Sequence, residues 1–217
     1  MSDRVVLAYF GRHGTTELNA KNCYRGMSDV SLDAAGCRDA RAMAKFFESI
    51  DLCRYVIMSD MTRTEETLRI INEERAEHGL PALIARPTSS LRPLDVGDLS
   101  GQPRSKENQA IIEYHAAHPD ISFPGGASLN EFRTRVRPVI NQAVELAQTC
   151  HKPVLVLGHS SIVHEVGQVV EGDHKAVVVR PGGIAALYWD APAGKFGASV
   201  ALKPDTEWPK RRGDLIS

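Results

Sequence analysis

The strongest constraint on the fold is the alternation of short apolar segments with longer amphipathic ones. Apolar runs at Val5–Phe10, Tyr55–Met58 and Val154–Leu157 have the length and composition of buried β-strands. Amphipathic or apolar segments with helical character follow them along the chain. Strands that alternate with helices favour an α/β domain. We therefore expect a three-layer sandwich, in which helices flank a mainly parallel central sheet.

Helical spacing and capping residues place the helices between these strands. Ser31 is expected to cap the first helix, and Ser59 or Asp60 the second. Ser128 and Glu131 have the spacing of a capping box. The predicted helices are Ser31–Glu48, Met61–His78, Ser105–His118 and Ser128–Cys150, and the further predicted strands are Val177–Val179, Ile184–Trp189 and Ala198–Leu202.

The length of 217 residues suits one large domain. No linker, repeat or low-complexity tract interrupts the pattern, so residues 1–205 are expected to form a single domain and residues 206–217 a polar tail. The segment Ser89–Pro124 holds many loop residues and is expected to form an excursion over one edge of the sheet.

Composition excludes several classes of function. Lys and Arg number 26 and Asp and Glu 27, giving a formal net charge of -1, so no basic field for nucleic acid is expected. No apolar run approaches the roughly 20 residues of a membrane span, and no signal peptide is expected. No feature of the sequence declares an oligomeric state.

Cysteine and histidine spacing argues against a metal site. The four cysteines are widely scattered without a C-x-x-C pair, which favours neither a disulfide framework nor zinc and suggests the cytoplasm. His115 and His118 lie three apart on a predicted helix and could ligate a metal, but no third ligand is evident. We expect both to face solvent.

Cationic side chains follow three of the predicted strands. Arg12 and His13 come after the first strand, Arg63 shortly after the second, and His159 after the third. Ligands of open α/β sheets bind beyond the carboxyl ends of the strands, so these groups are expected to meet there. Such a cluster needs an anion, and a phosphoryl group suits it because arginine binds one through paired N–H donors. Helices expected to begin near Gly14, Met61 and Ser161 would add backbone donors.

Several blocks, in order, resemble the histidine phosphatase superfamily, which includes the cofactor-dependent phosphoglycerate mutases. Arg12-His13-Gly14 resembles the family signature, and the other similar blocks are Thr15–Asn19, Tyr24–Gly26, Ser31–Gly36, Ser59–Thr64, Phe123–Leu129 and Leu157–Ser160. The resemblance covers most of the chain and implies a phosphoglycerate mutase-like fold.

The resemblance also implies the roles of individual residues. His13 is implied to be the nucleophile that becomes phosphohistidine, while Arg12, Arg63 and His159 hold the phosphoryl oxygens. Asn19 and Arg25 are candidates for substrate binding that could equally be turn residues. The other candidates for substrate binding are Gly14, Thr16, Gly26 and Ser160. The implied activity is hydrolysis of phosphoric monoesters of small metabolites, with no metal or other cofactor.

The chain departs from the family at the acid that protonates the leaving group. Pro93 stands where the family commonly has Glu, and Ala127 stands at a second position that is often acidic. Asp95 is the best substitute, because on an extended loop it faces the same way as residue 93. Asp98 and Glu165 are weaker candidates. If no acid exists, substrates whose leaving group departs unprotonated should be favoured, such as aryl phosphates.

Three other functions remain open. The missing Glu leaves room for a module that binds a phosphorylated ligand without turnover. A mutase is also possible, although Arg104 and Lys106 are the only Lys or Arg residues between Gly101 and Pro124, which suggests that water reaches the phosphohistidine. A serine hydrolase built on Gly158–Ile162 is disfavoured, because only 57 residues follow Ser160, too few for its remaining catalytic groups.

Overall fold

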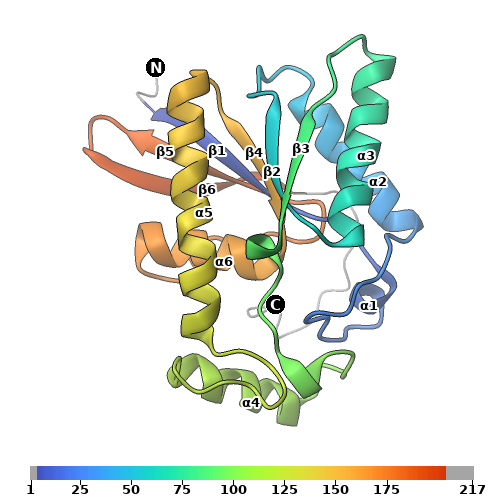
Figure 1. The fold of residues 1–217 in the computed structure, drawn as a ribbon, viewed down its shortest axis with the longest axis vertical. Coiled ribbons are helices and arrows are strands. Elements are labelled where there is room, and N and C mark those ends of the chain that lie inside the picture. The colour runs from blue at the N-terminus through green and yellow to red at the C-terminus, as the bar shows by residue number, and fades with distance from the viewer. Residues whose placement is uncertain (1–3, 204–217) are drawn as a thin grey trace.

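The computed structural model describes residues 4–203, and the expected tail at 206–217 lies outside them. Within that range the chain forms a six-stranded sheet in the order β3-β2-β4-β1-β5-β6 (Figure 1). The strands β3, β2, β4 and β1 are parallel to one another, whereas β5 is antiparallel to both of its neighbours, β1 and β6. The strands are β1 (Arg4–Arg12), β2 (Tyr55–Ser59), β3 (Ile84–Thr88), β4 (Val154–Gly158), β5 (Ile184–Asp190) and β6 (Lys195–Leu202).

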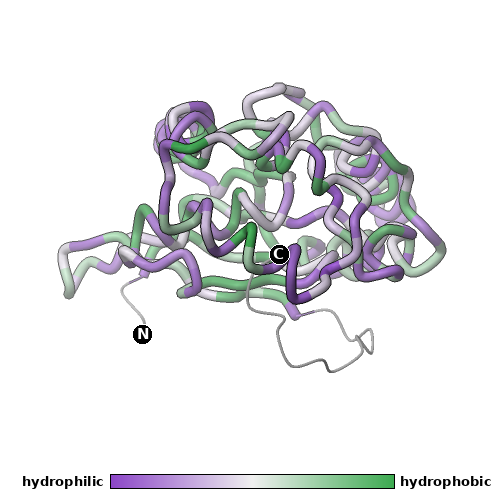
Figure 2. The backbone as a smooth tube through the Cα atoms, turned by 90° about the horizontal axis from the view of Figure 1, so that it is seen from below, coloured by the Kyte–Doolittle hydropathy of each residue, from purple (hydrophilic) through white to green (hydrophobic). Residues whose placement is uncertain are grey.

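Helices cover both faces of the sheet, which confirms the expected α/β sandwich. The helices are α1 (Glu17–Ala20), α2 (Ala34–Phe47), α3 (Thr62–Glu77), α4 (Lys106–Ala117), α5 (Leu129–Cys150) and α6 (Ser160–Glu171). Viewed from the end that carries α4, they alternate between hydrophobic and hydrophilic residues (Figure 2), as helices with one buried face should.

Two separate hydrophobic cores follow from the alternation of side chains along the strands. Phe10 points into the core beneath α5 and α6, where it joins Val136 and Ile162. Its neighbour Tyr9 points into the core beneath α2 and α3, with Phe47 and Ile71. Successive residues of one strand therefore serve opposite layers, and the sheet is held from both sides.

The structure corrects the set of predicted strands in two places. Val177–Val179 is not a strand, although Val177 and Val179 are buried. The Val179 carbonyl accepts a hydrogen bond from the Arg12 side chain. The edge strand β3 was not predicted, because its residues are largely exposed and it contains Pro87, which an edge position tolerates.

The structure also corrects the predicted helix starts. Asp33, and not Ser31, caps α2, through a bond from the Gly36 N–H to its carboxylate. Neither Ser59 nor Asp60 caps α3, whose N-cap is Met61. No helix begins near Gly14, since α1 starts at Glu17. The capping box at Ser128 and Glu131 is confirmed.

The excursion lies beyond the carboxyl ends of the parallel strands, on the side where α4 hangs below the sheet (Figure 1). It contains two short 3-10 turns, η1 (Ser89–Leu91) and η2 (Gly97–Leu99), and the helix α4. A third apolar cluster holds it together, formed by Tyr24, Val96, Leu99, Ile112 and Phe123. The excursion therefore covers the edge of the sheet at which ligands of this fold class bind.

Candidate active site

The end of β1 is fixed by backbone hydrogen bonds from two sides. The Arg12 N–H donates to the Gly183 carbonyl at 3.0 Å, and the His13 N–H donates to the Gly158 carbonyl at 3.0 Å. The next residue, Gly14, packs so closely on Gly36 that a Cβ atom at Gly14 would lie 2.3 Å from the Gly36 carbonyl oxygen. The position of the His13 ring is therefore set by rigid backbone.

A hydrogen bond at one nitrogen of His13 decides the chemistry of the other. His13 Nδ1 lies 2.6 Å from the Gly14 carbonyl oxygen, which can only accept, so Nδ1 carries the proton. Nε2 therefore keeps its lone pair. This nitrogen is buried and has no hydrogen-bond partner among the described residues. An unprotonated, unpartnered imidazole nitrogen is the form that a nucleophile requires.

His159 lies beside His13 at the end of β4. The two ring centroids are 5.3 Å apart, with 61° between the ring planes. His159 Nε2 lies 3.0 Å from the Ser59 hydroxyl oxygen, while its buried Nδ1 has no hydrogen-bond partner in residues 4–203. His159 is also the N-cap of α6, which aims the first turn of that helix at the same place.

Arg63 is completely buried near the start of α3 and keeps one edge of its guanidinium unused. Nη1 donates to the Ser28 carbonyl at 2.8 Å and lies 3.9 Å from the Asp29 carboxylate. Nε and Nη2 are buried and lack a partner among the residues described. The same edge of Arg92 binds both carboxylate oxygens of Asp60, at 2.8 Å each. Arg63 therefore presents an open bidentate site for an oxyanion.

Burial and mutual repulsion of positive charges lower the pKa values of the residues in this cluster. Burial, followed by the charge of Arg63, lowers the pKa of His13 well below 6.5, and the same two causes act on His159. Burial lowers the pKa of Arg63 to about 10. Arg25 is also buried here, and burial and then the charge of Arg12 lower its pKa. Such an arrangement is relieved by a bound anion.

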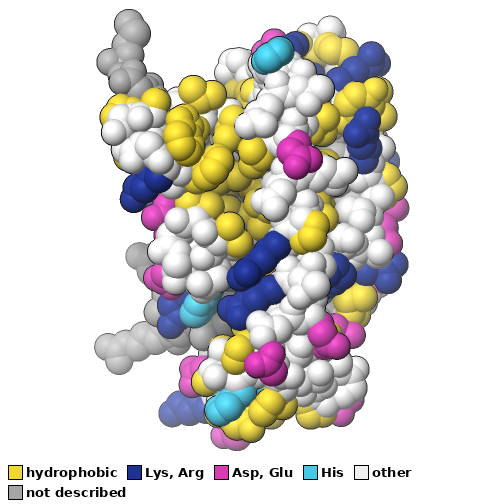
Figure 3. Space-filling model, turned by 60° about the vertical axis from the view of Figure 1, so that its left-hand side comes forward, with side chains coloured by type: hydrophobic (Ala, Val, Ile, Leu, Met, Phe, Trp, Pro, Cys, Tyr) yellow, Lys and Arg dark blue, Asp and Glu magenta, His cyan; other side chains and the backbone are white. Residues whose placement is uncertain are grey.

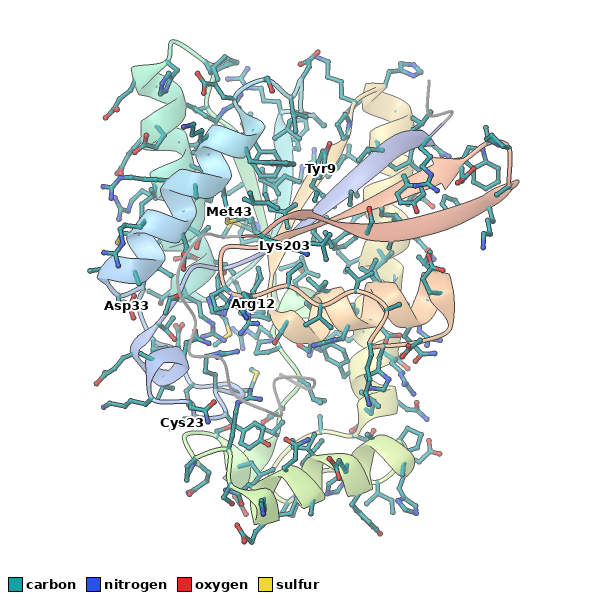
Figure 4. The ribbon with its side chains drawn as sticks, turned by 180° about the vertical axis from the view of Figure 1, so that it is seen from behind. Tyr9, Arg12, Cys23, Asp33, Met43 and Lys203 are labelled. Carbon is teal, nitrogen blue, oxygen red and sulfur yellow. The ribbon has the colours of Figure 1, made fainter. Side chains whose placement is uncertain are left out.

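Two cavities flank the cluster. One of about 520 Å³ is lined by Arg12, Asn19 and Arg25, and a second of about 190 Å³ is lined by Arg63, His159 and Arg25. Figure 4 shows Arg12, the last residue of β1, on the side of the sheet that faces the segment carrying Cys23. Cys23 lines the larger cavity too. On the face shown in Figure 3, Lys and Arg side chains form a local group with acidic side chains close by.

The other candidates for substrate binding occupy different positions. Gly26 and Ser160 line the smaller cavity and Asn19 the larger one. The Thr16 hydroxyl donates to the Asn19 side-chain oxygen at 3.0 Å within the capping box of α1, so Thr16 acts on Asn19. The Gly14 N–H donates to the Thr67 hydroxyl at 3.3 Å, which gives Gly14 a role in packing.

The structure does not bring Asp95 to the site. Its carboxylate accepts from the Gly97 N–H at 3.0 Å and so closes its own turn, and Asp95 lines neither cavity, whereas Pro93 lines the smaller one. Because the loop turns after Pro93, the side chains of Pro93 and Asp95 do not face the same cavity, contrary to the expectation. Asp98 is exposed. Glu165 does line the smaller cavity, but its carboxylate is paired with Arg133 at 3.4 Å and Arg137 at 2.7 Å.

Two residues that the sequence does not mark as part of the site hold the cluster in place. The sequence indicates Ser59 only as a possible helix cap, yet its hydroxyl contacts His159. Thr67, one helical turn after Arg63, donates to the Arg63 carbonyl at 2.7 Å and accepts from Gly14. A small hydroxyl residue at a strand end beside a catalytic block was the available signal for Ser59.

The expectation that His115 faces solvent was wrong. His115 is buried, with its ring centroid 4.1 Å from that of Phe123, because Nδ1 is satisfied by the Ile121 carbonyl oxygen at 3.0 Å. His118 is exposed, as expected. Between residues 4 and 203 no three His, Cys, Asp or Glu side chains are grouped to hold a metal ion. Across the same residues, no helix has the length and apolarity to cross a membrane.

Comparison with known sequences identifies relatives along most of the chain. Residues 8–174 match the sequence model of the histidine phosphatase superfamily, branch 1. A 2,3-bisphosphoglycerate-dependent phosphoglycerate mutase from Bradyrhizobium sp. (strain ORS 278) is 29% identical over 176 residues, which is 79% of this chain and 83% of the relative. A mutase of the same name from Beijerinckia indica is 30% identical over 166 residues, 74% of this chain and 79% of the relative.

Solved structures share the fold. An Escherichia coli protein provisionally named an alpha-ribazole-5'-P phosphatase superimposes with a TM-score of 0.68 at 19% identity, covering 92% of this chain and 96% of that one. A phosphoglycerate mutase from Thermus thermophilus gives a TM-score of 0.66 at 22% identity, covering 90% and 99%. At these identities the likeness establishes architecture.

Proposed function

Because the chain belongs to the histidine phosphatase superfamily, branch 1, we propose that it is a metal-independent phosphatase that hydrolyses small phosphorylated metabolites through a phosphohistidine on His13. One observation carries the proposal. His13 Nε2, His159 Nδ1 and the Nε–Nη2 edge of Arg63 are all buried and all lack hydrogen-bond partners among the described residues. A lone pair beside several unsatisfied donors is the arrangement that phosphoryl transfer to nitrogen needs.

In the first step, His13 Nε2 attacks phosphorus as the bond to the leaving oxygen breaks. The phosphoryl group becomes bonded to Nε2, and the alcohol leaves as its oxyanion or with a proton from water. Arg12, Arg63 and His159 stabilise the charge on the equatorial oxygens, and loss of one such donor typically costs about 2.7–4 kcal/mol. The His13 ring has no exposed surface. Substrate therefore reaches the ring only after a movement around it, and we propose that Arg25, which lines both cavities, makes this movement.

In the second step, water attacks the phosphorus of phosphohistidine. The P–N bond breaks, inorganic phosphate leaves and His13 regains its lone pair. The Nδ1–H bond to Gly14 keeps the ring in the same tautomer throughout. The arginines supply the positive charge that a metal ion provides in other phosphatases. The four cysteines, all free thiols, agree with a reducing, cytoplasmic setting.

The related mutases make phosphoglycerate mutase activity the second candidate. A mutase must hold its phosphorylated intermediate away from water. Two features favour hydrolysis. Between residues 101 and 124, Arg104 and Lys106 are the only Lys or Arg residues of the excursion that covers the site. The part of the smaller cavity formed by Tyr24, Val96, Ile112 and Phe123 is apolar and gives a second phosphate or a carboxylate little to bind.

Rapid-quench labelling on a panel of phosphorylated metabolites tests the proposal. We expect acid-labile, base-stable phosphate on the wild-type protein, release of inorganic phosphate at the same turnover, and no effect of EDTA. His13→Gln should abolish labelling and lower kcat by roughly 10³-fold or more, while His118→Gln, at an exposed position, serves as the matched control.

Three other results would contradict the proposal. Labelling that persists and is returned to an acceptor alcohol indicates a mutase. Saturable binding with no labelling indicates a phospho-ligand-binding module. Turnover that survives His13→Gln but is lost in Ser160→Ala indicates a serine nucleophile.

A further inference from the structure

We propose that the smaller cavity binds the leaving group of the substrate and selects a compact apolar one, preferably a single aromatic ring attached to phosphate as an aryl ester. This inference rests on the proposed function and names its substrate class. The cavity shares Arg63 and His159 with the phosphoryl site and continues away from them towards the excursion. A phosphate held at the cluster therefore has its ester oxygen directed at this space or at the larger cavity.

The far wall of the cavity is apolar and preformed. Tyr24, Val96, Ile112 and Phe123 belong to one buried cluster and all line it. The Tyr24 hydroxyl is satisfied by the Gln109 side chain at 3.0 Å. The wall therefore offers aromatic and aliphatic surface, the usual lining of a pocket that takes an apolar group.

Away from the phosphoryl site, Arg133, Glu165 and Arg104 line this cavity and are already engaged. Arg133 contacts Glu165 at 3.4 Å and Asn130 at 3.2 Å, and Glu165 is buried between Arg133 and Arg137. The Arg104 guanidinium lies over the Tyr24 ring, 4.5 Å from its centroid. A second phosphate or carboxylate on the substrate would compete with Glu165 for Arg133. The side of the cavity lined by Arg133 and Glu165 thus disfavours a second anion and admits a neutral group.

The cavity also has a size that limits its occupant. Its volume is about 190 Å³. An apolar protein cavity of about 150 Å³ is known to hold benzene. One ring with a small substituent therefore fits within this volume.

Pro93 determines which leaving groups can depart from the phosphate. It lines the cavity, it stands where the family that the chain resembles commonly has the acid Glu, and it has no proton to give. A phenol has a pKa of about 10, like the tyrosine side chain, so phenolate departs without that proton. An alkoxide is a far more basic leaving group, because its parent alcohol is almost as weak an acid as water, and it does not depart without a proton. The apolar wall and the missing acid therefore select the same substrate class.

Phosphonates test the binding part without turnover. We would measure the dissociation constants of benzylphosphonate and methylphosphonate by calorimetry. Burial of a phenyl ring is worth enough that benzylphosphonate should bind about tenfold tighter, or more. Ile112→Phe, which fills the cavity, should bring the ratio to within about twofold of unity. The matched control is Ile111→Phe on the exposed side of the same helix, which should keep the wild-type ratio.

A second pair of variants guards against misfolding of Ile112→Phe. Ala116 lines the cavity yet is exposed, so Ala116→Phe narrows the cavity without overpacking a core. Its matched control is Ala117→Phe at the exposed end of α4. Ala116→Phe should weaken benzylphosphonate binding severalfold and leave methylphosphonate unchanged, and the control should affect neither.

Turnover of three esters tests the chemical part. Phenyl and benzyl phosphate should share a low KM, and ethyl phosphate should have a higher one. The kcat for phenyl phosphate should exceed that for benzyl phosphate by at least about 10²-fold, because no acid assists the alkoxide. Equal affinity for the two phosphonates, or equal kcat for phenyl and benzyl phosphate, overturns the inference. If His13 is still labelled and phosphate still released, the proposed function stands, whereas selective phosphonate binding without labelling or turnover rejects the phosphatase and keeps the apolar site.

Discussion

The rings of His13 and His159 lie 5.3 Å apart, centroid to centroid, in a site where both are fully or almost fully buried. Neither ring can gain a proton without facing Arg63, whose charge contributes to the lowered pKa of each. The pair is therefore held neutral until an oxyanion arrives. Stability, ligand binding and reactivity should all depend on this one electrostatic fact.

Stability should fall in acid because of these two rings. Unfolded histidine titrates near pH 6.5, and both folded pKa values lie well below that. Below pH 6.5 the unfolded chain binds more protons than the folded one, so the free energy of unfolding decreases as pH falls from 6.5 towards the folded pKa values. The two groups together contribute a slope of up to about 2.7 kcal/mol per pH unit.

Urea unfolding between pH 5 and 8 measures this slope. The double variant His13→Gln/His159→Gln should have a clearly flatter profile over the acidic part of that range. His118→Gln, at an exposed site, should keep the wild-type slope. Equal slopes in all three proteins would show that the two rings are already protonated in the folded state.

Removing one arginine should stabilise the protein while weakening its ligand. Arg25 is buried among Arg12, Arg63 and Arg104, which, after burial, are the causes of its lowered pKa. Arg25→Met should raise the free energy of unfolding by about 1–2 kcal/mol, because a desolvated like charge is lost. It should also weaken binding of inorganic phosphate by about tenfold or more. Arg38→Met is the exposed control. A variant that loses stability and keeps phosphate affinity would contradict the account.

Ser59 should act through His159. Its hydroxyl is 3.0 Å from His159 Nε2 and sets which nitrogen faces the site. Ser59→Ala should lower kcat by about tenfold, with a smaller change in KM. A purely structural role would not change the tautomer, so ¹⁵N NMR of the His159 ring is the deciding readout. An unchanged tautomer in Ser59→Ala would refute the positioning role.

An acid can be restored at position 93. Pro93 lines the smaller cavity, and Pro93→Glu places a carboxyl group there. Hydrolysis of alkyl phosphates should rise by about 10²-fold, because general acid catalysis is worth that much, while aryl phosphates gain little. The pH profile should acquire a basic limb. Asp95→Asn should leave the wild-type profile unchanged, since that carboxylate closes its own turn. If the wild-type profile already has a basic limb and Asp95→Asn removes it, or if Asp95→Asn loses activity, Asp95 is the acid after all.

The sequence located the residues that directly follow strands, because parallel strands deliver their carboxyl ends to one edge. That rule and the motif were enough to predict that Arg12, His13 and His159 lie at the same edge of the sheet. Arg63 needed in addition the family block around it, since it lies beyond the N-cap of α3.

Features set by contacts between distant segments were not predictable in this way. The Val177–Val179 segment has the composition of a strand, but the Val179 carbonyl binds a side chain from β1. The edge strand β3 pairs on one side alone and shows no apolar run. The facing of Asp95 depended on a turn that Gly97 closes, with a positive φ of 52°. In the first two cases the deciding partner is distant in the sequence, whereas the facing of Asp95 depends on a turn with a neighbour two residues away.

The most direct test of the account is a crystal structure of the protein with orthovanadate, which adopts the geometry of a phosphoryl group in transfer. We predict vanadium bonded to His13 Nε2, with oxygens within hydrogen-bond distance of Arg12, of the Nε–Nη2 edge of Arg63 and of His159 Nδ1. Vanadate held elsewhere, or held with the His13 ring turned away from it, would contradict the claim that these four side chains surround one oxyanion.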